Sequence, residues 1–118
     1  MILVVDHDPE VLERAATVLN HTRHVLLAST AEEAFSMVRK LGGFSVVLVD
    51  LELPGAYPLI EKLHNSDPLL LIIAISGAMK SAVTEATEDL GVVEVLRKPV
   101  TPDWKPAVER VRARRFDG

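Results

Sequence analysis

Residues 45–50 read SVVLVD, and this short run indicates the architecture of the whole chain. Residues 46–49 are all apolar, and three of the four are Val. An unbroken apolar run is typical of a strand covered on both faces, because a strand with one face in water alternates apolar and polar residues. The run leads directly into Asp50, so the sequence predicts a buried strand that carries a carboxylate to its C-terminal end.

Comparable runs lie on both sides of this strand. Short stretches rich in Val, Ile and Leu cover residues 2–5, 24–28, 69–75 and 92–96. Helical patterns separate them, near residues 9–20, 31–41, 56–65 and 80–90. A fifth helix is expected after Thr101-Pro102, with its start distorted or delayed by Pro106. This alternation predicts an α/β fold, a doubly wound sheet of five parallel strands with crossover helices.

Two of these helices carry capping signals in the sequence. Asp8, followed by Pro9, reads as an N-cap with proline at the first helical position. Residues 30–33, Thr-Ala-Glu-Glu, form a capping box, and that helix is expected to end at Gly42 and Gly43.

The composition narrows the class of protein. The chain has 118 residues, enough for one hydrophobic core and one domain over residues 1–118. It contains no cysteine, which excludes disulfides, thiolate metal sites and cysteine nucleophiles. A formal net charge of −4 argues against direct nucleic-acid binding by the domain as a whole. Because no apolar run could cross a bilayer and no secretory signal precedes the first strand, we expect a cytoplasmic protein without a membrane partner.

Polar residues follow the predicted strands at their C-terminal ends. Asp6, His7 and Asp8 follow the first strand, and Asp50 follows the third. Ser76 and Lys98 follow the fourth and fifth strands. In an open parallel sheet these ends meet at one edge, where ligands bind. Carboxylates, an imidazole, a hydroxyl and an ammonium group together suit phosphate and divalent-metal chemistry, although Asp8 alone is better explained as a helix cap.

Four segments resemble the receiver domain of bacterial two-component response regulators, the CheY-like family. They are ILVVDHDPEVL at residues 2–12, VVLVDLELPG at 46–55, LIIAISGA at 71–78 and VLRKPVTP at 95–102. The resemblance covers essentially the whole chain and implies a flavodoxin-like (βα)5 fold with strand order 2-1-3-4-5. It also implies a cis peptide bond between Lys98 and Pro99.

The resemblance assigns roles to the residues at the strand ends. Asp50 is implied as the phosphoacceptor, Ser76 as the hydroxyl that turns toward the phosphoryl group, and Lys98 as its counter-ion. Asp6, Asp50 and the backbone carbonyl of Glu52 are implied as ligands of Mg²⁺.

The resemblance also implies partners. They are a sensor histidine kinase or a phosphotransfer protein, which supplies the phosphoryl group, and a downstream effector protein or domain. A homodimer through the fourth helix, fifth strand and fifth helix is a further option. Such a domain is a phosphoprotein in a phosphorelay and not an enzyme.

Three positions depart from the family pattern. His7 stands where the family usually has a second acid, and an imidazole should weaken a Mg²⁺ site because Mg²⁺ prefers oxygen ligands. Val95 stands where the family often has an aromatic residue that moves on activation. Pro58 replaces a usual glycine and should stiffen the turn after the phosphoacceptor strand.

Two alternative functions stay open at this point. The first is a pseudo-receiver, an interaction module of the same fold that is not phosphorylated, and His7 and Val95 favour it. The second is a small phosphatase, because the sequence Asp6-His7-Asp8 is similar to the DxD motif of haloacid-dehalogenase-type phosphatases. In that enzyme Asp6 would be the nucleophile and Asp8 the acid/base.

Trp104 is the single tryptophan of the chain. Its neighbours Asp103 and Lys105 are charged, and we expect the apolar stripe of the last helix to be formed by Ala107, Val108 and Val111. We therefore expect Trp104 to be at least partly exposed, on the face that receivers use for partners.

Overall fold

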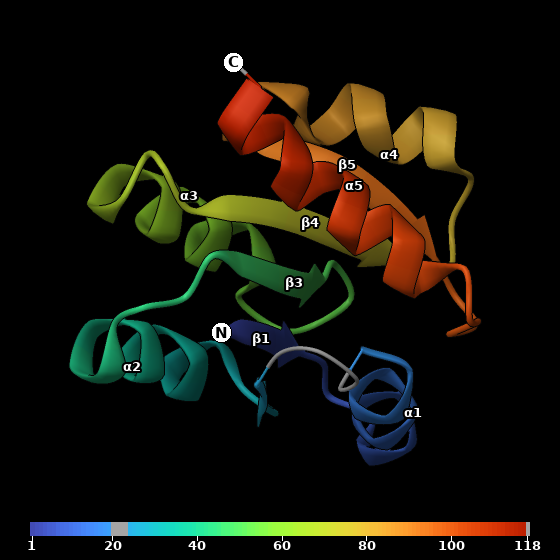
Figure 1. Cartoon of the computed structure of the whole chain (residues 1–118). Coiled ribbons are helices and arrows are strands. Elements are labelled where there is room, and N and C mark those ends of the chain that lie inside the picture. The colour runs from blue at the N-terminus through green and yellow to red at the C-terminus, as the bar shows by residue number, and fades with distance from the viewer. Residues whose placement is uncertain (20–23, 118) are drawn as a thin grey trace.

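The computed structural model describes residues 1–19 and 24–117, with side chains described as far as Arg114. Five parallel strands form one sheet in the order β2-β1-β3-β4-β5 (Figure 1). The strands are β1 (Ile2–Val5), β2 (Val25–Ala28), β3 (Val46–Asp50), β4 (Leu71–Ser76) and β5 (Val92–Arg97). Both the parallel fold and the strand order implied by the resemblance are confirmed.

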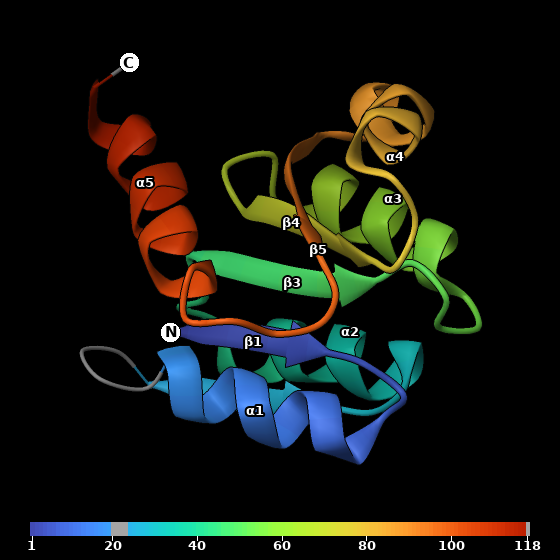
Figure 2. The same cartoon turned by 90° about the vertical axis from the view of Figure 1, so that its right-hand side faces the viewer.

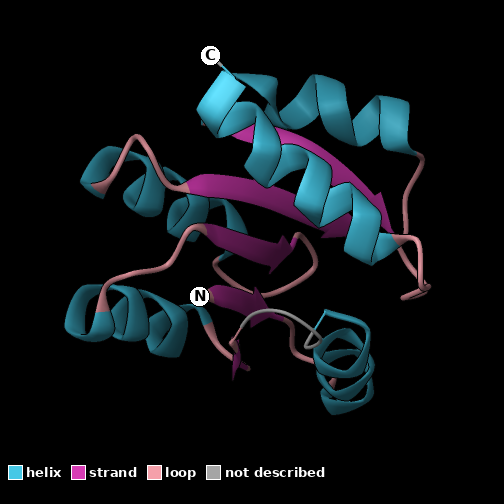
Figure 3. Cartoon of the chain, viewed as in Figure 1, coloured by secondary structure: helices cyan, strands magenta, loops and turns pink. Residues whose placement is uncertain are grey.

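Helices cover both faces of this sheet (Figure 3). They are α1 (Pro9–Leu19), α2 (Ala31–Leu41), α3 (Ala56–Ser66), α4 (Lys80–Thr87) and α5 (Trp104–Asp117), with a short 3₁₀ turn η1 (Glu88–Leu90) after α4. The views in Figures 1 and 2 place α1 and α5 on one face and α2 and α3 on the other. None of the described helices is long and apolar enough to cross a lipid bilayer.

The two faces of β3 supply the two halves of the core. Val46 and Leu48 pack under α1 and α5, whereas Val47 and Val49 pack under α2 and α3. Every residue of β3 is buried, which explains why its sequence does not alternate. The strand therefore ends in a buried carboxylate, Asp50.

The capping signal at the start of α2 forms one of the two contacts of a capping box, and the second is shifted by one residue. The amide of Glu33 donates to Thr30 Oγ1 at 3.1 Å, while Glu33 Oε1 accepts from the amide of Ser29, one residue before the cap. At the other end of α2, Gly42 has a φ of 64° and its amide donates to the carbonyl of Val38. A residue with a side chain is strained at that φ, so glycine suits this helix end.

Several boundaries differ by one or two residues from the sequence expectation. β4 begins at Leu71 and not at Leu69, because Asp67 starts a turn: its carboxylate accepts from the amide of Leu69 and its carbonyl from the amide of Leu70. α1 ends at Leu19, and Asn20, where we expected its end, lies outside the described residues.

The α5 helix begins at Trp104, so Pro106 falls in its first turn. Proline is tolerated there because the first amides of a helix have no intrahelical acceptor. The helix therefore begins after Pro102 and before Pro106, and Pro106 is accommodated inside it.

The expectation for Trp104 was wrong. Only 3% of the residue is exposed, and it belongs to the core cluster under α1 and α5. Trp104 lies three, four and seven positions before Ala107, Val108 and Val111. These spacings put all four residues on one helical face, and the charges of Asp103 and Lys105 say nothing about that face.

Candidate functional site

The C-terminal ends of four adjacent strands meet at one edge of the sheet. β1 leads into Asp6, β3 and β4 end with Asp50 and Ser76, and Lys98 comes directly after β5. The arrowheads of β1, β3 and β4 point the same way in Figure 2. We call Asp6, His7, Asp50, Ser76 and Lys98 the edge pocket.

Asp50 is fully buried, and both of its oxygens have close neighbours. Oδ1 accepts the amide hydrogen of Glu52 at 3.0 Å and lies 3.3 Å from Lys98 Nζ. Oδ2 lies 2.7 Å from Nδ1 of His7, whose side chain is 51% exposed. An ionised carboxylate can only accept, so His7 donates through Nδ1 in this arrangement.

Asp6 is also fully buried, and it shares Lys98 with Asp50. Its Oδ1 accepts from the amide of Asp8 at 2.9 Å and lies 3.5 Å from His7 Nδ1, while Oδ2 is 2.9 Å from Lys98 Nζ. Burial raises the pKa of Asp6 above its ordinary value; the Asp8 amide and Lys98 oppose this, and the charge of Asp50 adds to it. The ionised form of Asp6 is therefore disfavoured in the edge pocket.

Lys98 is the positive group between the two carboxylates. Burial by itself would lower the pKa of Lys98, but Asp6 and Asp50 outweigh burial and hold that pKa above its ordinary value. The ammonium group consequently stays charged at neutral pH. The peptide bond from Lys98 to Pro99 is cis, as the resemblance implied.

Ser76 ends β4 next to these groups and is 4% exposed. Its Oγ accepts from the amide of Ala78 at 3.0 Å, so the hydroxyl hydrogen can be donated elsewhere. The carbonyl of Ser76 accepts from the amide of Lys98 at 2.9 Å, which ties the ends of β4 and β5 together.

Two backbone contacts of the edge pocket were missed from the sequence. The family resemblance implied a role for the backbone carbonyl of Glu52 as a metal ligand; the contact that the structure shows is from the Glu52 amide to Asp50. The amide of Asp8 binds Asp6 in the same way, two residues after the carboxylate. An Asp that ends a strand and is followed by a turn often accepts the amide two residues on, which is the signal that could have found both.

The side chain of Asp8 lies outside the edge pocket. Its Oδ1 accepts the amide hydrogen of Glu10 at 2.9 Å at the start of α1. This is the contact of a helix N-cap, so the simpler explanation of Asp8 fits the geometry better than an acid/base role beside Asp6.

A metal ion could be held by Asp6, His7 and Asp50, which offer ligand atoms all within 4.8 Å of one another. Mg²⁺ requires near-octahedral oxygen coordination and strongly prefers oxygen over nitrogen. One of the three side chains here is an imidazole, and its Nδ1 already lies 2.7 Å from Oδ2 of Asp50. This donor set does not fit Mg²⁺ well.

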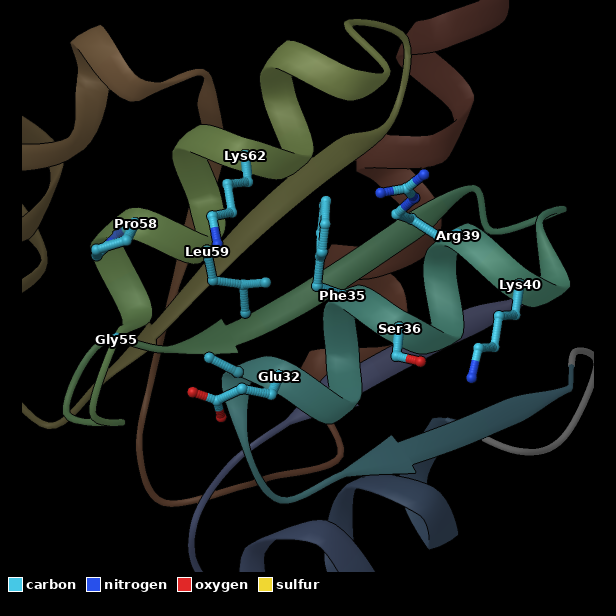
Figure 4. A pocket seen from close by; sticks show the side chains of 10 residues that line it. Glu32, Phe35, Ser36, Arg39, Lys40, Gly55, Pro58, Leu59 and Lys62 are labelled. Carbon is cyan, nitrogen blue, oxygen red and sulfur yellow. The ribbon is translucent and has the colours of Figure 1, made fainter.

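The departures at Val95 and Pro58 lie outside the edge pocket. Val95 is buried in a small cluster with Ala74 and Val83 under α4. Pro58 lies in the first turn of α3 and lines a cavity of about 610 Å³ between α2 and α3 (Figure 4). That cavity is lined mainly by α2 and α3 residues, including Phe35, Arg39 and Lys62, and contains no member of the edge pocket.

A second group of charges joins α4, β5 and α5. Glu94 of β5 lies 2.9 Å from Lys80 Nζ and 3.7 Å from Arg114 Nη2. Burial by itself would raise the pKa of Glu94, but the bonds from Lys80 and the Val95 amide, with the charge of Arg114, outweigh burial and lower it. Glu94 therefore links both α4 and α5 to β5.

Comparisons with known proteins agree with this fold. A family profile described as response regulator receiver domain matches residues 2–105. No curated protein sequence matches significantly. The CheY-like response regulator receiver domain protein from Methanospirillum hungatei is 25% identical with a TM-score of 0.88, covering 98% of this chain and 95% of that one.

Two more distant structures share the fold. A response regulator from Thermotoga maritima is 21% identical with a TM-score of 0.85, over 95% of this chain and 96% of that one. NtrX from Brucella abortus is 22% identical with a TM-score of 0.88, over 98% of this chain and 27% of that longer one. The profile match over most of the chain, with this fold, shows that the chain belongs to the response regulator receiver domain family.

Proposed function

We propose that Asp50 accepts a phosphoryl group from a phosphohistidine of a sensor histidine kinase or phosphotransfer protein. The observation that carries this proposal is the placement of Asp50: it is fully buried at the end of β3, with the ammonium group of Lys98 3.3 Å from its Oδ1. A carboxylate nucleophile next to a fixed cation is a recognised route to an aspartyl phosphate.

The contacts of Asp50 favour Oδ2 as the attacking oxygen. Oδ1 is held by the amide of Glu52 and by Lys98, whereas Oδ2 faces the exposed imidazole of His7. His7 would first rotate away. Oδ2 would then bond to phosphorus as the bond from phosphorus to the donor imidazole nitrogen breaks. The other ring nitrogen of the donor histidine takes a proton from solvent, so the donor leaves as a neutral imidazole.

Lys98 and Ser76 would stabilise the product. The charged Lys98 offsets the negative charge that the phosphoryl oxygens bring to the edge pocket. Ser76 would donate its hydroxyl hydrogen to a phosphoryl oxygen and pull the loop after β4 with it. Such a pull would bias an equilibrium between two existing conformations. This mechanism requires no aromatic residue at position 95, where this chain has Val95.

The output surface in this proposal is formed by α4, β5 and α5. The loop after Ser76 leads into α4, and Glu94 ties α4 and α5 to β5. A shift of that loop would change the surface offered to an effector or to a second copy of the chain. We further propose one domain over residues 1–118, a cytoplasmic location, and no enzymatic turnover, direct nucleic-acid binding or membrane partner.

The test is phosphorylation by phosphoramidate, whose phosphorus–nitrogen bond resembles that of phosphohistidine. The intact protein is weighed after incubation with and without divalent cations. Wild type should gain one phosphoryl group and Asp50→Asn none, while Asp8→Asn, which changes a helix cap, should still be modified. Equal modification of wild type and Asp50→Asn contradicts the proposal.

A second candidate is a pseudo-receiver that binds partners without phosphorylation. The 2.7 Å contact between His7 Nδ1 and Asp50 Oδ2 favours it, because a hydrogen-bonded carboxylate is a weaker nucleophile. In that case Asp50→Ala would leave partner binding unchanged and phosphoramidate would leave the mass of wild type unchanged.

A further inference from the structure

We infer that Asp6, His7 and Asp50 together bind a divalent transition-metal ion that accepts imidazole, represented by Zn²⁺, in preference to Mg²⁺. The role of the ion rests on the proposed function, because the ion would lie beside the proposed phosphoacceptor, Asp50. It differs from the Mg²⁺ site that the family resemblance implies, and it follows from the donors of this chain.

The donor atoms favour a borderline metal ion. Imidazole is a good ligand for Zn²⁺ and its neighbours in the first transition series, whereas Mg²⁺ selects carboxylate, carbonyl and water oxygens. The cluster offers one nitrogen and two carboxylates. Zn²⁺ accepts both His nitrogen and Asp oxygen as ligands, and a zinc site with three protein ligands keeps a fourth position open.

The positions of the oxygens divide the pocket into two sides. Lys98 contacts Oδ2 of Asp6 and Oδ1 of Asp50. The other two oxygens, Oδ1 of Asp6 and Oδ2 of Asp50, face His7. An ion between His7 and these oxygens would therefore leave the Lys98 contacts in place.

The distances suit tetrahedral coordination after a small movement. With metal–ligand bonds of about 2.1 Å, two ligands of a tetrahedral ion lie about 3.4 Å apart. His7 Nδ1 is 3.5 Å from Asp6 Oδ1, close to that separation. It is 2.7 Å from Asp50 Oδ2, a hydrogen bond that must open when the metal replaces the hydrogen. The imidazole can move outward because half of it is exposed.

The charges favour a cation at this place. Asp6 and Asp50 are fully buried, and within the described residues Lys98 is the ammonium group that contacts both carboxylates. With neutral His7 the pocket retains a net negative charge. A divalent ion removes the repulsion between the two carboxylates.

The experiment measures metal affinity without any phosphoryl donor. Zn²⁺ and Mg²⁺ are titrated separately by calorimetry into wild type, His7→Asp, His7→Gln and His24→Asp. His24 is exposed just before β2, at the opposite end of that strand from the edge pocket, so His24→Asp makes the same chemical change elsewhere. Co²⁺ absorption on wild type and His7→Gln reports whether nitrogen is a ligand.

Wild type and His24→Asp should bind Zn²⁺ at least about tenfold more tightly than Mg²⁺. Both His7 variants should lose at least about tenfold in Zn²⁺ affinity, and His7→Asp alone should gain Mg²⁺ affinity. Circular dichroism checks that every variant is folded.

Equal Zn²⁺ affinity in wild type and both His7 variants overturns the inference, as does a loss seen equally in His24→Asp. Wild type that binds Mg²⁺ as tightly as Zn²⁺ also overturns it. Failure of the phosphorylation test with these metal affinities as expected would reject the proposed function and leave the metal site standing. Phosphorylation of Asp50 in a protein that shows no preference for Zn²⁺ would support the proposed function and reject the metal site.

Discussion

At the scale of single residues, the half-exposed side chain of His7 contacts the buried Asp50, with Nδ1 2.7 Å from Asp50 Oδ2. This contact engages the oxygen that we propose as the nucleophile. Because the imidazole is half exposed, a partner or a metal ion can reach it and draw it away. The reactivity of Asp50 in this account therefore depends on one residue that the family pattern does not provide.

Trp104 shows what neighbouring residues cannot predict. The charged residues on either side suggested exposure, but the helical period places Trp104 in the core, where Nε1 donates to the carbonyl of Arg97 at 3.4 Å. The sequence showed the apolar stripe of Ala107, Val108 and Val111, but it was not recognised that Trp104 is the first residue of that stripe. Adjacent residues on a helix point in different directions, so local charge is a poor guide to burial.

The burial of Trp104 predicts a large loss of stability in Trp104→Ala. Truncating a buried tryptophan removes apolar contacts and leaves a cavity, which costs about 3–5 kcal/mol. Urea unfolding followed by circular dichroism measures this change. The control is Tyr57→Ala, an aromatic residue that is 43% exposed and should change stability by less than about 0.5 kcal/mol. Similar losses in the two variants would contradict the described packing.

At the scale of elements, the apolar runs predicted all five strands. Their alternation with helical patterns predicted that the strands are parallel. Burial on both faces gives continuous apolar runs, and such runs can be recognised in the sequence without knowledge of the tertiary structure. The ends of β4 were less accurate, because the turn at Asp67 takes up two apolar residues that the run had included. The link from Glu94 to Lys80 and Arg114 could not be predicted, since it depends on how two helices lie beside β5.

The Glu94 link predicts a pH dependence of stability. The pKa of Glu94 is lowered in the folded protein, so its contribution is present above its ordinary value of 4.5 and is lost as the pH falls through the folded pKa. Wild type should be more stable than Glu94→Gln at neutral pH, and the difference should shrink below pH 4.5.

Urea unfolding of both proteins at a series of pH values measures this difference. Glu13→Gln, on an exposed position of α1, serves as the control and should show no such trend. A difference for Glu94→Gln that stays constant down to the acid transition would show that the ion pairs contribute nothing.

At the scale of the whole molecule, the parallel sheet brings Asp6, Asp50, Ser76 and Lys98 to one edge from distant parts of the sequence. This convergence could be predicted, because the ends of parallel strands meet at one edge whatever the details of packing. The distances within the pocket could not be, since they depend on side-chain rotamers and on turns of two or three residues. The assignment of Asp50 as phosphoacceptor is still a proposal.

The most direct test of that proposal locates the phosphoryl group. Wild type treated with phosphoramidate is reduced with borohydride, which converts an aspartyl phosphate to homoserine, and the peptides are sequenced by mass spectrometry. The account predicts homoserine at position 50 and unmodified aspartate at positions 6 and 8. Homoserine at position 6, where the phosphatase hypothesis places its nucleophile, or at neither position 6 nor position 50, would contradict the account.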